Sequence, residues 1–320
     1  MNKSKYKQER NSHKEEINGF TAWLKTRHFA SDTIRAESNY TASFLAWEAQ
    51  QQAQTPEITY NELLTFVDHC ITQGDSKTLI NRKLSAIRKY YEYLLYEGKA
   101  LKNPATGLFI KNKQHTLPSN LLTPEELTAI YDNYQVTDLR SQRNKVIIGL
   151  LVYQGVTREE LDKLEIGHVK LTAGKIEIPG GKHSNGRTLK LEAVQILDLQ
   201  EYISTTRPAI LKGEGIYKIG RKPDSINQEK AQRQLFISMH GSDIMKNSFL
   251  HLVYALRRLN PKLINAQQIR QSVITIWLKT KDLRTTQYMA GHRYVSSTER
   301  YQVNQLDDLQ DALNQFHPLK

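Results

Sequence analysis

The segment from Gln267 to Tyr301 constrains the fold of this chain more than any other. Apolar residues recur in it at helical spacing over residues 269–278, and a second, shorter helix is predicted over residues 283–290. Gly291 ends the second helix, which places His292 on a turn and not inside a packed helix face. We therefore expect a helical domain whose polar side chains gather where helices end.

Three polar residues of this segment, Arg270, His292 and Tyr301, are of types that suit phosphate chemistry. A guanidinium can hold phosphate oxygens, an imidazole can share protons near neutral pH, and a phenol can attack as a nucleophile. The alternative is a basic helical domain in which Arg270 and His292 cap helices and Tyr301 is a surface aromatic.

The order of these residues resembles the C-terminal signature of the tyrosine recombinases, the phage integrase family. In that family an Arg is followed by a helix, by Gly-His and by Ser-Thr-x-x-Tyr, which here correspond to Arg270, Gly291-His292 and residues 297–301. The resemblance implies that Tyr301 is the nucleophile, that Arg270 clamps the non-bridging phosphate oxygens and that His292 assists with charge and proton transfer. It also implies site-specific cutting and rejoining of double-stranded DNA through a 3′-phosphotyrosine, without metal, ATP or another cofactor.

Two positions depart from the family's pattern. Where the family has Gly-x-Arg-x-x-Glu-Leu with a phosphate-gripping Arg, residues 155–161 place Thr157, and Arg158 comes one residue late. One residue is a rotation of about 100° on a helix, so Arg158 could substitute only with a local change of backbone. Where the family has the His of His-x-x-Arg, this chain has Gln267, which can donate a hydrogen bond to phosphate but brings no charge.

These departures leave other functions open. One is a catalytically silent relative that binds DNA as an architectural or regulatory factor. Another is relaxation of supercoiled DNA by the same tyrosine chemistry.

Alternating segments over residues 175–178 and 188–191 flank a glycine-rich loop and predict a β-hairpin. The resemblance implies that Lys182, in this loop, is the general acid for the leaving 5′-oxygen, and we expect Arg187 to contact DNA. A further short strand is predicted over residues 235–238, and the basic segment 207–234 is interpreted as a mobile loop.

Residues 14–98 show helical spacing throughout and resemble the core-binding domain of the same family. The last helix of this part carries basic residues on its outward side, and we predict that they contact DNA phosphates. These residues are Lys77, Arg82, Lys83, Arg88 and Lys89. The alternative is an ordinary solvated charged face.

The net charge of +12 favours a polyanionic partner, with nucleic acid before an anionic membrane. No apolar run reaches membrane-spanning length, and no signal peptide opens the sequence. The single cysteine, Cys70, excludes an internal disulfide framework and favours the reducing cytoplasm.

The predicted fold is mostly α with a small β-sheet, in two domains. Residues 1–104 form a helical DNA-binding domain, residues 105–122 a linker and residues 123–320 the catalytic domain. An amphipathic helix over residues 303–320 either folds back on its own domain or, as the resemblance implies, docks on a neighbouring protomer of a tetramer on DNA. An accessory DNA-bending protein is a further partner that such recombination can use.

Overall fold

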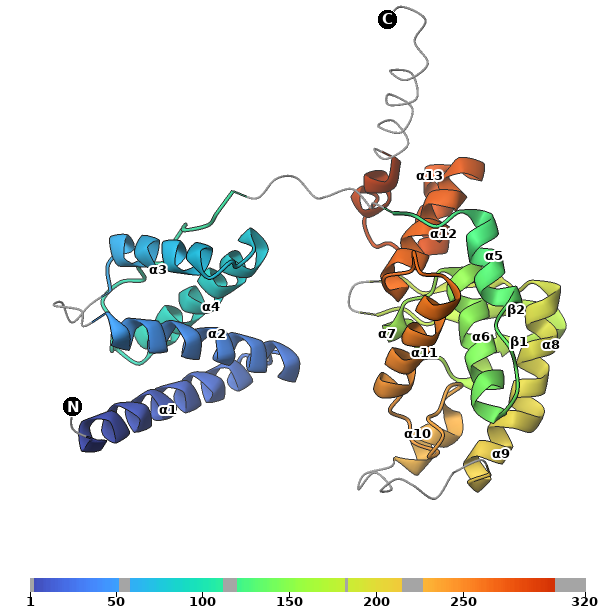
Figure 1. Cartoon of the computed structure of the whole chain (residues 1–320), viewed down its shortest axis with the longest axis horizontal. Helices are drawn as coiled ribbons and strands as arrows, with labels where there is room; N and C mark the ends of the chain where they lie inside the picture. Colours follow the sequence, from blue (N-terminus) through green and yellow to red (C-terminus); the bar gives the residue numbers. More distant parts are fainter. Residues whose placement is uncertain (1–2, 52–57, 112–119, 182–183, 215–226, 303–320) are drawn as a thin grey trace, which may run out of the picture. The chain divides into compact units, whose positions relative to one another are not determined.

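The computed structural model describes residues 3–51, 58–111, 120–181, 184–214 and 227–302. The chain divides into two compact units, Met1–His115 and Thr116–Lys320 (Figure 1). It is mostly helical, with one three-stranded sheet in the second unit, which confirms the predicted fold class. Across the described ranges, every helix is too short or too polar to traverse a bilayer.

The described part of the N-terminal unit is built from α1 (Lys3–Thr26), α2 (Ser31–Gln50), α3 (Tyr60–Thr72) and α4 (Lys77–Tyr96). Aromatic residues fill its core, and Phe44 and Phe66 meet edge to face at 5.2 Å between ring centroids. Thr59 caps α3 through a reciprocal capping box with Glu62, so the start of this helix is encoded locally.

Residues 105–110, which we assigned to the linker, pack on the N-terminal unit. Ala105 and Leu108 lie in its core, and Arg88 donates hydrogen bonds to both of their carbonyl oxygens, at 3.2 and 2.9 Å. The side chain of Asn81 pairs in both directions with the backbone of Ile110. The N-terminal unit therefore extends beyond residue 104.

The C-terminal unit is organised around one buried helix, α6 (Leu139–Gln154), whose apolar residues are enclosed on nearly every side. It packs against α5 (Pro124–Asp132), α8 (Ala193–Glu201) and α12 (Ala266–Thr280), as Figure 1 shows. Further helical elements are α7 (Arg158–Leu161), η1 (Ile166–His168), η2 (Leu171–Ala173), η3 (Tyr202–Thr206), α9 (Arg207–Lys212), α10 (Gln228–Arg233), α11 (Lys246–Leu259) and α13 (Leu283–Ala290). Residues 296–302 are also helical.

The sheet contains β1 (Val169–Lys170), β2 (Lys175–Ile178) and β3 (Arg187–Lys190), all antiparallel, so the hairpin prediction is confirmed. Alternate residues of β2 and β3 face the core, as strand geometry requires. Ile178 pairs with Arg187 in the register, and Arg187 is buried on the same face as Leu189. A charged side chain thus occupies a core-facing strand position.

The predicted strand over residues 235–238 is wrong. The segment is buried, but its only ladder contact is a bridge formed by Gln234 just before it. Its hydrogen bonds come from several separate elements instead: the Tyr202 hydroxyl donates to Leu235 O at 2.9 Å, Arg143 Nη1 donates to Ile237 O at 3.0 Å, and Leu235 N donates to Leu164 O at 2.7 Å. The prediction of a loop over 207–234 is likewise wrong at its ends, which form α9 and α10.

Candidate active site

Arg270 lies on α12 and is only 6% exposed. Its Nη1 donates to Gly155 O and its Nη2 to Ala290 O, each at 2.5 Å. These carbonyls stand at the C-terminal ends of α6 and α13, where helices leave unpaired acceptors and a partial negative charge. The guanidinium therefore joins two helix ends. Each terminal nitrogen keeps a second N–H, which is not needed for these bonds.

Glu160, on α7, is the carboxylate of the site and is 3% exposed. It accepts two hydrogen bonds from Arg187, at 2.6 and 3.1 Å, and lies 3.8 Å from Arg270 Nη1. Burial alone would raise the pKa of the Glu160 carboxyl, but the hydrogen bonds and charge of Arg187, with help from Arg270, hold that pKa below its ordinary value. Glu160 is therefore ionised and balances two arginines.

Gly291 brings the hairpin and the histidine together. It ends α13 with φ +66°, a left-handed conformation that glycine adopts without strain. A Cβ on Gly291 would lie 2.5 Å from Arg187 Nη1, so the missing side chain also makes room for the guanidinium. Its carbonyl accepts a hydrogen bond from Asn185 N at 2.9 Å, and Ser184 pairs with His292 as a β-bridge. The hairpin loop is thereby anchored beside His292.

His292 stands on the turn after α13, as predicted, and its Nδ1 shares a 2.8 Å hydrogen bond with Thr298 Oγ1. Burial, and then the positive charges of Arg270, Arg187 and Arg300, lower the pKa of His292 to about 4. At neutral pH the ring is therefore an uncharged imidazole, in which one nitrogen carries a proton and the other can accept one.

Tyr301 is 9% exposed, and its ring stacks on that of His292 with centroids 6.1 Å apart and planes 15° from parallel. Burial raises the pKa of the Tyr301 phenol, although Arg270 and Arg300 act against this. The hydroxyl is therefore protonated at neutral pH, and any attack by it requires a proton acceptor.

The pKa of His292 gives a direct test of this arrangement. Because it lies near 4 in the folded protein and near 6.5 when unperturbed, the unfolded chain binds a proton that the native chain does not between these values. We expect stability to fall as pH falls from 6.5 to 4. We also expect the ring resonances of His292, identified by their loss in His292→Gln, to titrate with a midpoint near 4 in an NMR experiment. A midpoint at or above 6.5 would contradict the enclosed site.

The remaining predicted catalytic residues lie in different places. Arg158 is half-buried, with its guanidinium 3.6 Å from Asp162, and Thr157 caps α7. Gln267 is exposed on the first turn of α12. Lys182 lies outside the described residues, as does the helix predicted over 303–320.

The five cations predicted to contact DNA on α4 differ in their environments. Lys83 forms an ion pair with Asp75, Lys89 forms one with Glu37, and Arg88 holds backbone carbonyls of its own unit. Lys77 and Arg82 are exposed. Of the five, these two are the freest to reach a phosphate backbone.

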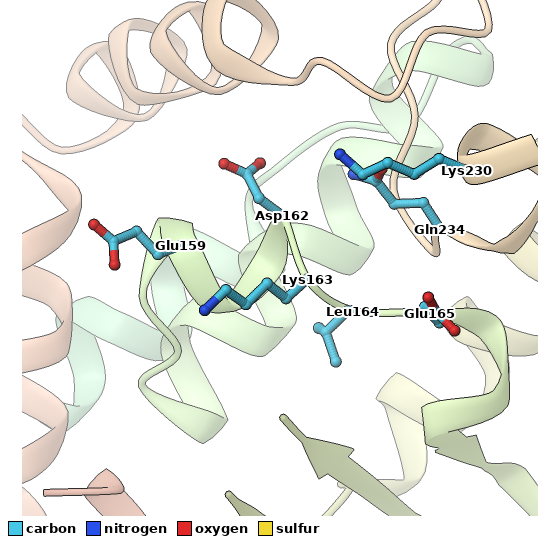
Figure 2. Close-up of a pocket in the computed structure, with 7 residues that line it drawn as sticks. All are labelled: Glu159, Asp162, Lys163, Leu164, Glu165, Lys230 and Gln234. Atoms are coloured by element: carbon cyan, nitrogen blue, oxygen red, sulfur yellow. The ribbon is translucent and has the colours of Figure 1, made fainter. Parts of the chain in front are cut away.

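A hollow of about 470 Å³ lies beside α7 (Figure 2), and its lining does not include the two arginines that contact Glu160, Arg187 and Arg270. Its charged lining residues are Glu159, Asp162, Lys163, Glu165 and Lys230, so carboxylates outnumber ammonium groups. A phosphate would be repelled there more than attracted. The hollow is therefore a poor candidate for a phosphate-binding site.

The sequence analysis did not predict that Glu160 and Arg187 contact each other beside Arg270 and His292. Two signals pointed to them. Thr157 and Glu160 have the spacing of a capping box, which fixes Glu160 at the start of a helix. Arg187 shares its parity along the strand with Leu189 and Leu191, which places it on the core-facing side.

A buried arginine cluster, a neutral histidine and an enclosed tyrosine on a helical domain with a small sheet define the catalytic domain of a tyrosine recombinase. The chain matches the Phage integrase family over residues 120–307 and the N-terminal SAM-like domain of phage integrases over residues 17–98. The first match covers more than half of the chain, which therefore belongs to the phage integrase family.

Individual relatives agree with this assignment. Tyrosine recombinase XerD of Staphylococcus aureus (strain Mu50) is 27% identical over 253 residues, which are 78% of this chain and 80% of that protein. The XerH site-specific recombinase, solved with palindromic difH substrate as a post-cleavage complex, has a TM-score of 0.68 at 19% identity over 90% of this chain and 81% of its own. The Tn1549 transposon integrase, solved with transposon right end DNA, has a TM-score of 0.64 at 14% identity over 94% of this chain and 99% of its own. These two structures share the fold.

Proposed function

We propose that this chain is a site-specific recombinase that cuts and rejoins double-stranded DNA through a 3′-phosphotyrosine at Tyr301. One observation carries the proposal: Tyr301 stacks on a neutral His292 within the field of Arg270. The relatives support it, because XerD is named a tyrosine recombinase and XerH was captured on its DNA substrate after cleavage.

In the proposed reaction the Tyr301 hydroxyl oxygen attacks the phosphorus of the scissile phosphate. A bond forms between phosphorus and the phenolic oxygen, the bond to the 5′-oxygen breaks, and a 5′-hydroxyl leaves. A second strand's 5′-hydroxyl then attacks the phosphotyrosine and restores the phosphodiester. One phosphoester bond replaces another in each step, so no external energy source is required.

Three side chains support this reaction. The unused N–H groups of Arg270 bind the non-bridging oxygens, where negative charge builds up in the transition state. The neutral imidazole of His292 assists with charge and proton transfer beside the phenol, and Lys182 gives a proton to the leaving 5′-oxygen. These roles fit the raised pKa of Tyr301 and the lowered pKa of His292.

The proposed DNA partner fits the net charge of +12 and the exposed Lys77 and Arg82 on α4. Binding through phosphate contacts should weaken steeply as salt rises. Exchange between two duplexes breaks four strands and requires four tyrosines, so we propose a tetramer on DNA.

Covalent trapping tests the proposal. Nicked duplexes that the protein binds are incubated with it, and SDS-resistant protein–DNA complexes are measured. We expect such a complex with the wild-type chain and none with Tyr301→Phe, which removes only the attacking oxygen. Tyr294→Phe is the matched control, because Tyr294 is 67% exposed in the same region and should leave the complex intact.

The same experiment separates the alternatives. Tight, salt-dependent binding without a covalent complex would identify a silent DNA-binding relative, and site-independent removal of supercoils would identify a topoisomerase-like activity. A complex that persists in Tyr301→Phe would disprove the assignment of the nucleophile.

A further inference from the structure

The position where the family carries its first phosphate-binding arginine cannot supply a cation here. Thr157 has an uncharged side chain, and its Oγ1 accepts a hydrogen bond from Glu160 N at 3.2 Å at the start of α7. Its backbone N–H donates to Glu160 Oε2 at 2.8 Å. The neighbouring Arg158 is 40% exposed and pairs with Asp162.

A second guanidinium nevertheless reaches the centre from another element. Arg187 comes from β3, its side chain is 0% exposed, and it contacts Glu160 through both terminal nitrogens. It packs directly on Gly291, the residue before His292. Among the described residues, the enclosed Nε atoms of Arg187 and of Arg158 have no hydrogen-bond partner, and of these two arginines Arg187 is the one that packs on Gly291. A buried polar nitrogen without a partner is rare in native structures unless a ligand or water completes it.

The balance of charge points in the same direction. Arg187 and Arg270 surround one buried carboxylate, Glu160, so this cluster of three carries a net charge of +1. The carbonyls of Gly155 and Ala290 offset part of the charge of Arg270, and a structural ion pair with Glu160 would need only one of the two arginines. The positive field extends to the reacting groups, because both arginines disfavour the charged form of His292. Such a field favours an anion beside His292.

We propose that Arg187 supplies the second positive charge that holds the scissile phosphate, replacing from β3 the arginine that Thr157 lacks. This inference rests on the proposed function and extends it to a residue outside the family's signature. The charge of Arg187 acts on the non-bridging oxygens together with that of Arg270. The stabilisation that it provides therefore depends on the phosphate carrying a negative charge.

A substrate with a neutral phosphate separates this role from a structural one. The probe is a duplex that the protein binds, whose contacted phosphate has been located by ethylation interference. It is prepared with an ordinary phosphate there and with a methylphosphonate, in which a methyl group replaces one charged oxygen. Arg187→Met should form the covalent complex about 10²-fold more slowly than wild type on phosphate. On methylphosphonate we expect the difference to shrink to within roughly tenfold, because the missing cation no longer has a charge to meet.

Two variants make the result specific. Arg187→Lys keeps a charge opposite Glu160 and should lie between wild type and Arg187→Met on phosphate, and it replaces the Met variant if that protein melts below the assay temperature. Lys190→Ala is the matched control, because Lys190 is an exposed cation on the same strand, and it should remain near wild type on both substrates. Near-wild-type rates of Arg187→Met on phosphate would overturn the inference. So would an equal defect on both substrates in a folded variant, since that is the result of misplacing Glu160 and Arg270.

A binding measurement keeps this inference separate from the proposed reaction. In the Tyr301→Phe background, which retains the arginines, affinities for the two duplexes are compared with and without Arg187→Met. We expect the preference for the charged phosphate to fall about tenfold with Arg187→Met, which corresponds to 1.4 kcal/mol. If wild type forms no covalent complex, the proposed reaction fails. The binding result then decides the inference by itself. A preference for the charged phosphate that falls with Arg187→Met supports the inference, and a preference that does not change overturns it.

Discussion

Replacing Arg270 with alanine is expected to slow formation of the covalent complex on the order of 10³-fold, because it removes the side chain that we propose as the principal donor to the non-bridging oxygens. The change also leaves Gly155 O and Ala290 O, each now held at 2.5 Å, without their partner. The ends of α6 and α13 then lose their connection, so the position of His292 after α13 suffers as well. Both consequences lower the rate.

Arg270→Lys tests the geometry of this residue apart from its charge. Lysine carries a single ammonium group and lacks the planar guanidinium with its two terminal nitrogens. It therefore cannot bond to the ends of both helices and bind a phosphate at the same time. We expect a loss of about 10²-fold. Rates are measured in single turnover with the duplex saturated, so that weaker binding does not enter. Lys279→Ala removes an exposed charge from the same helix and should change the rate by only a few-fold. Full activity of Arg270→Lys would show that charge alone suffices.

Local rules predicted the parts of this site that lie on regular helix ends. The helix over 283–290 and the turn at Gly291-His292 follow from helical spacing and a glycine, and the structure confirms both. In each case neighbours in sequence determine the conformation, so the sequence alone is enough.

The contacts that build the charged cluster were not predictable in this way. Glu160 and Arg187 lie 27 positions apart and meet only because the hairpin packs against α7. Arg270 is held by the carbonyl oxygen of Gly155, which lies 115 positions away in the sequence. For the same reason, residues 235–238 resembled a strand, although two of their carbonyls accept hydrogen bonds from the distant side chains of Tyr202 and Arg143. Tertiary packing overrides local propensity at all three places.

The largest effect on stability is expected from Glu160→Ala. It leaves Arg187, whose side chain is 0% exposed, and Arg270, at 8%, without their carboxylate. Removing one partner of a buried ion pair typically costs about 3–5 kcal/mol, since the remaining charge stays enclosed and unpaired. The change also removes the acceptor of Thr157 N at the start of α7. The free energy of urea unfolding can be followed through Trp277 in a chain whose Trp23 and Trp47 are phenylalanine.

Two comparisons identify the cause of this loss. Glu159→Ala alters the exposed neighbour on the same short helix and should change stability by about 0.5 kcal/mol or less. Combining Glu160→Ala with Arg187→Met should cost less than the sum of the two single changes, because the second removes one of the charges that the first leaves unpaired. Strict additivity would mean that the two residues do not stabilise each other.

The pH dependence of unfolding tests whether the ionised carboxylate of Glu160 stabilises the protein. The pKa of Glu160 is held below its ordinary value of 4.5, so the ionised carboxylate contributes its full stabilisation above that pH and loses it progressively below. Glu160→Gln cannot ionise, and its unfolding free energy should decline less steeply than that of wild type below pH 4.5. An identical acid decline in the two proteins would mean that the arginines do not depend on this charge, and the 3–5 kcal/mol expected for Glu160→Ala would then have to come from lost packing and capping.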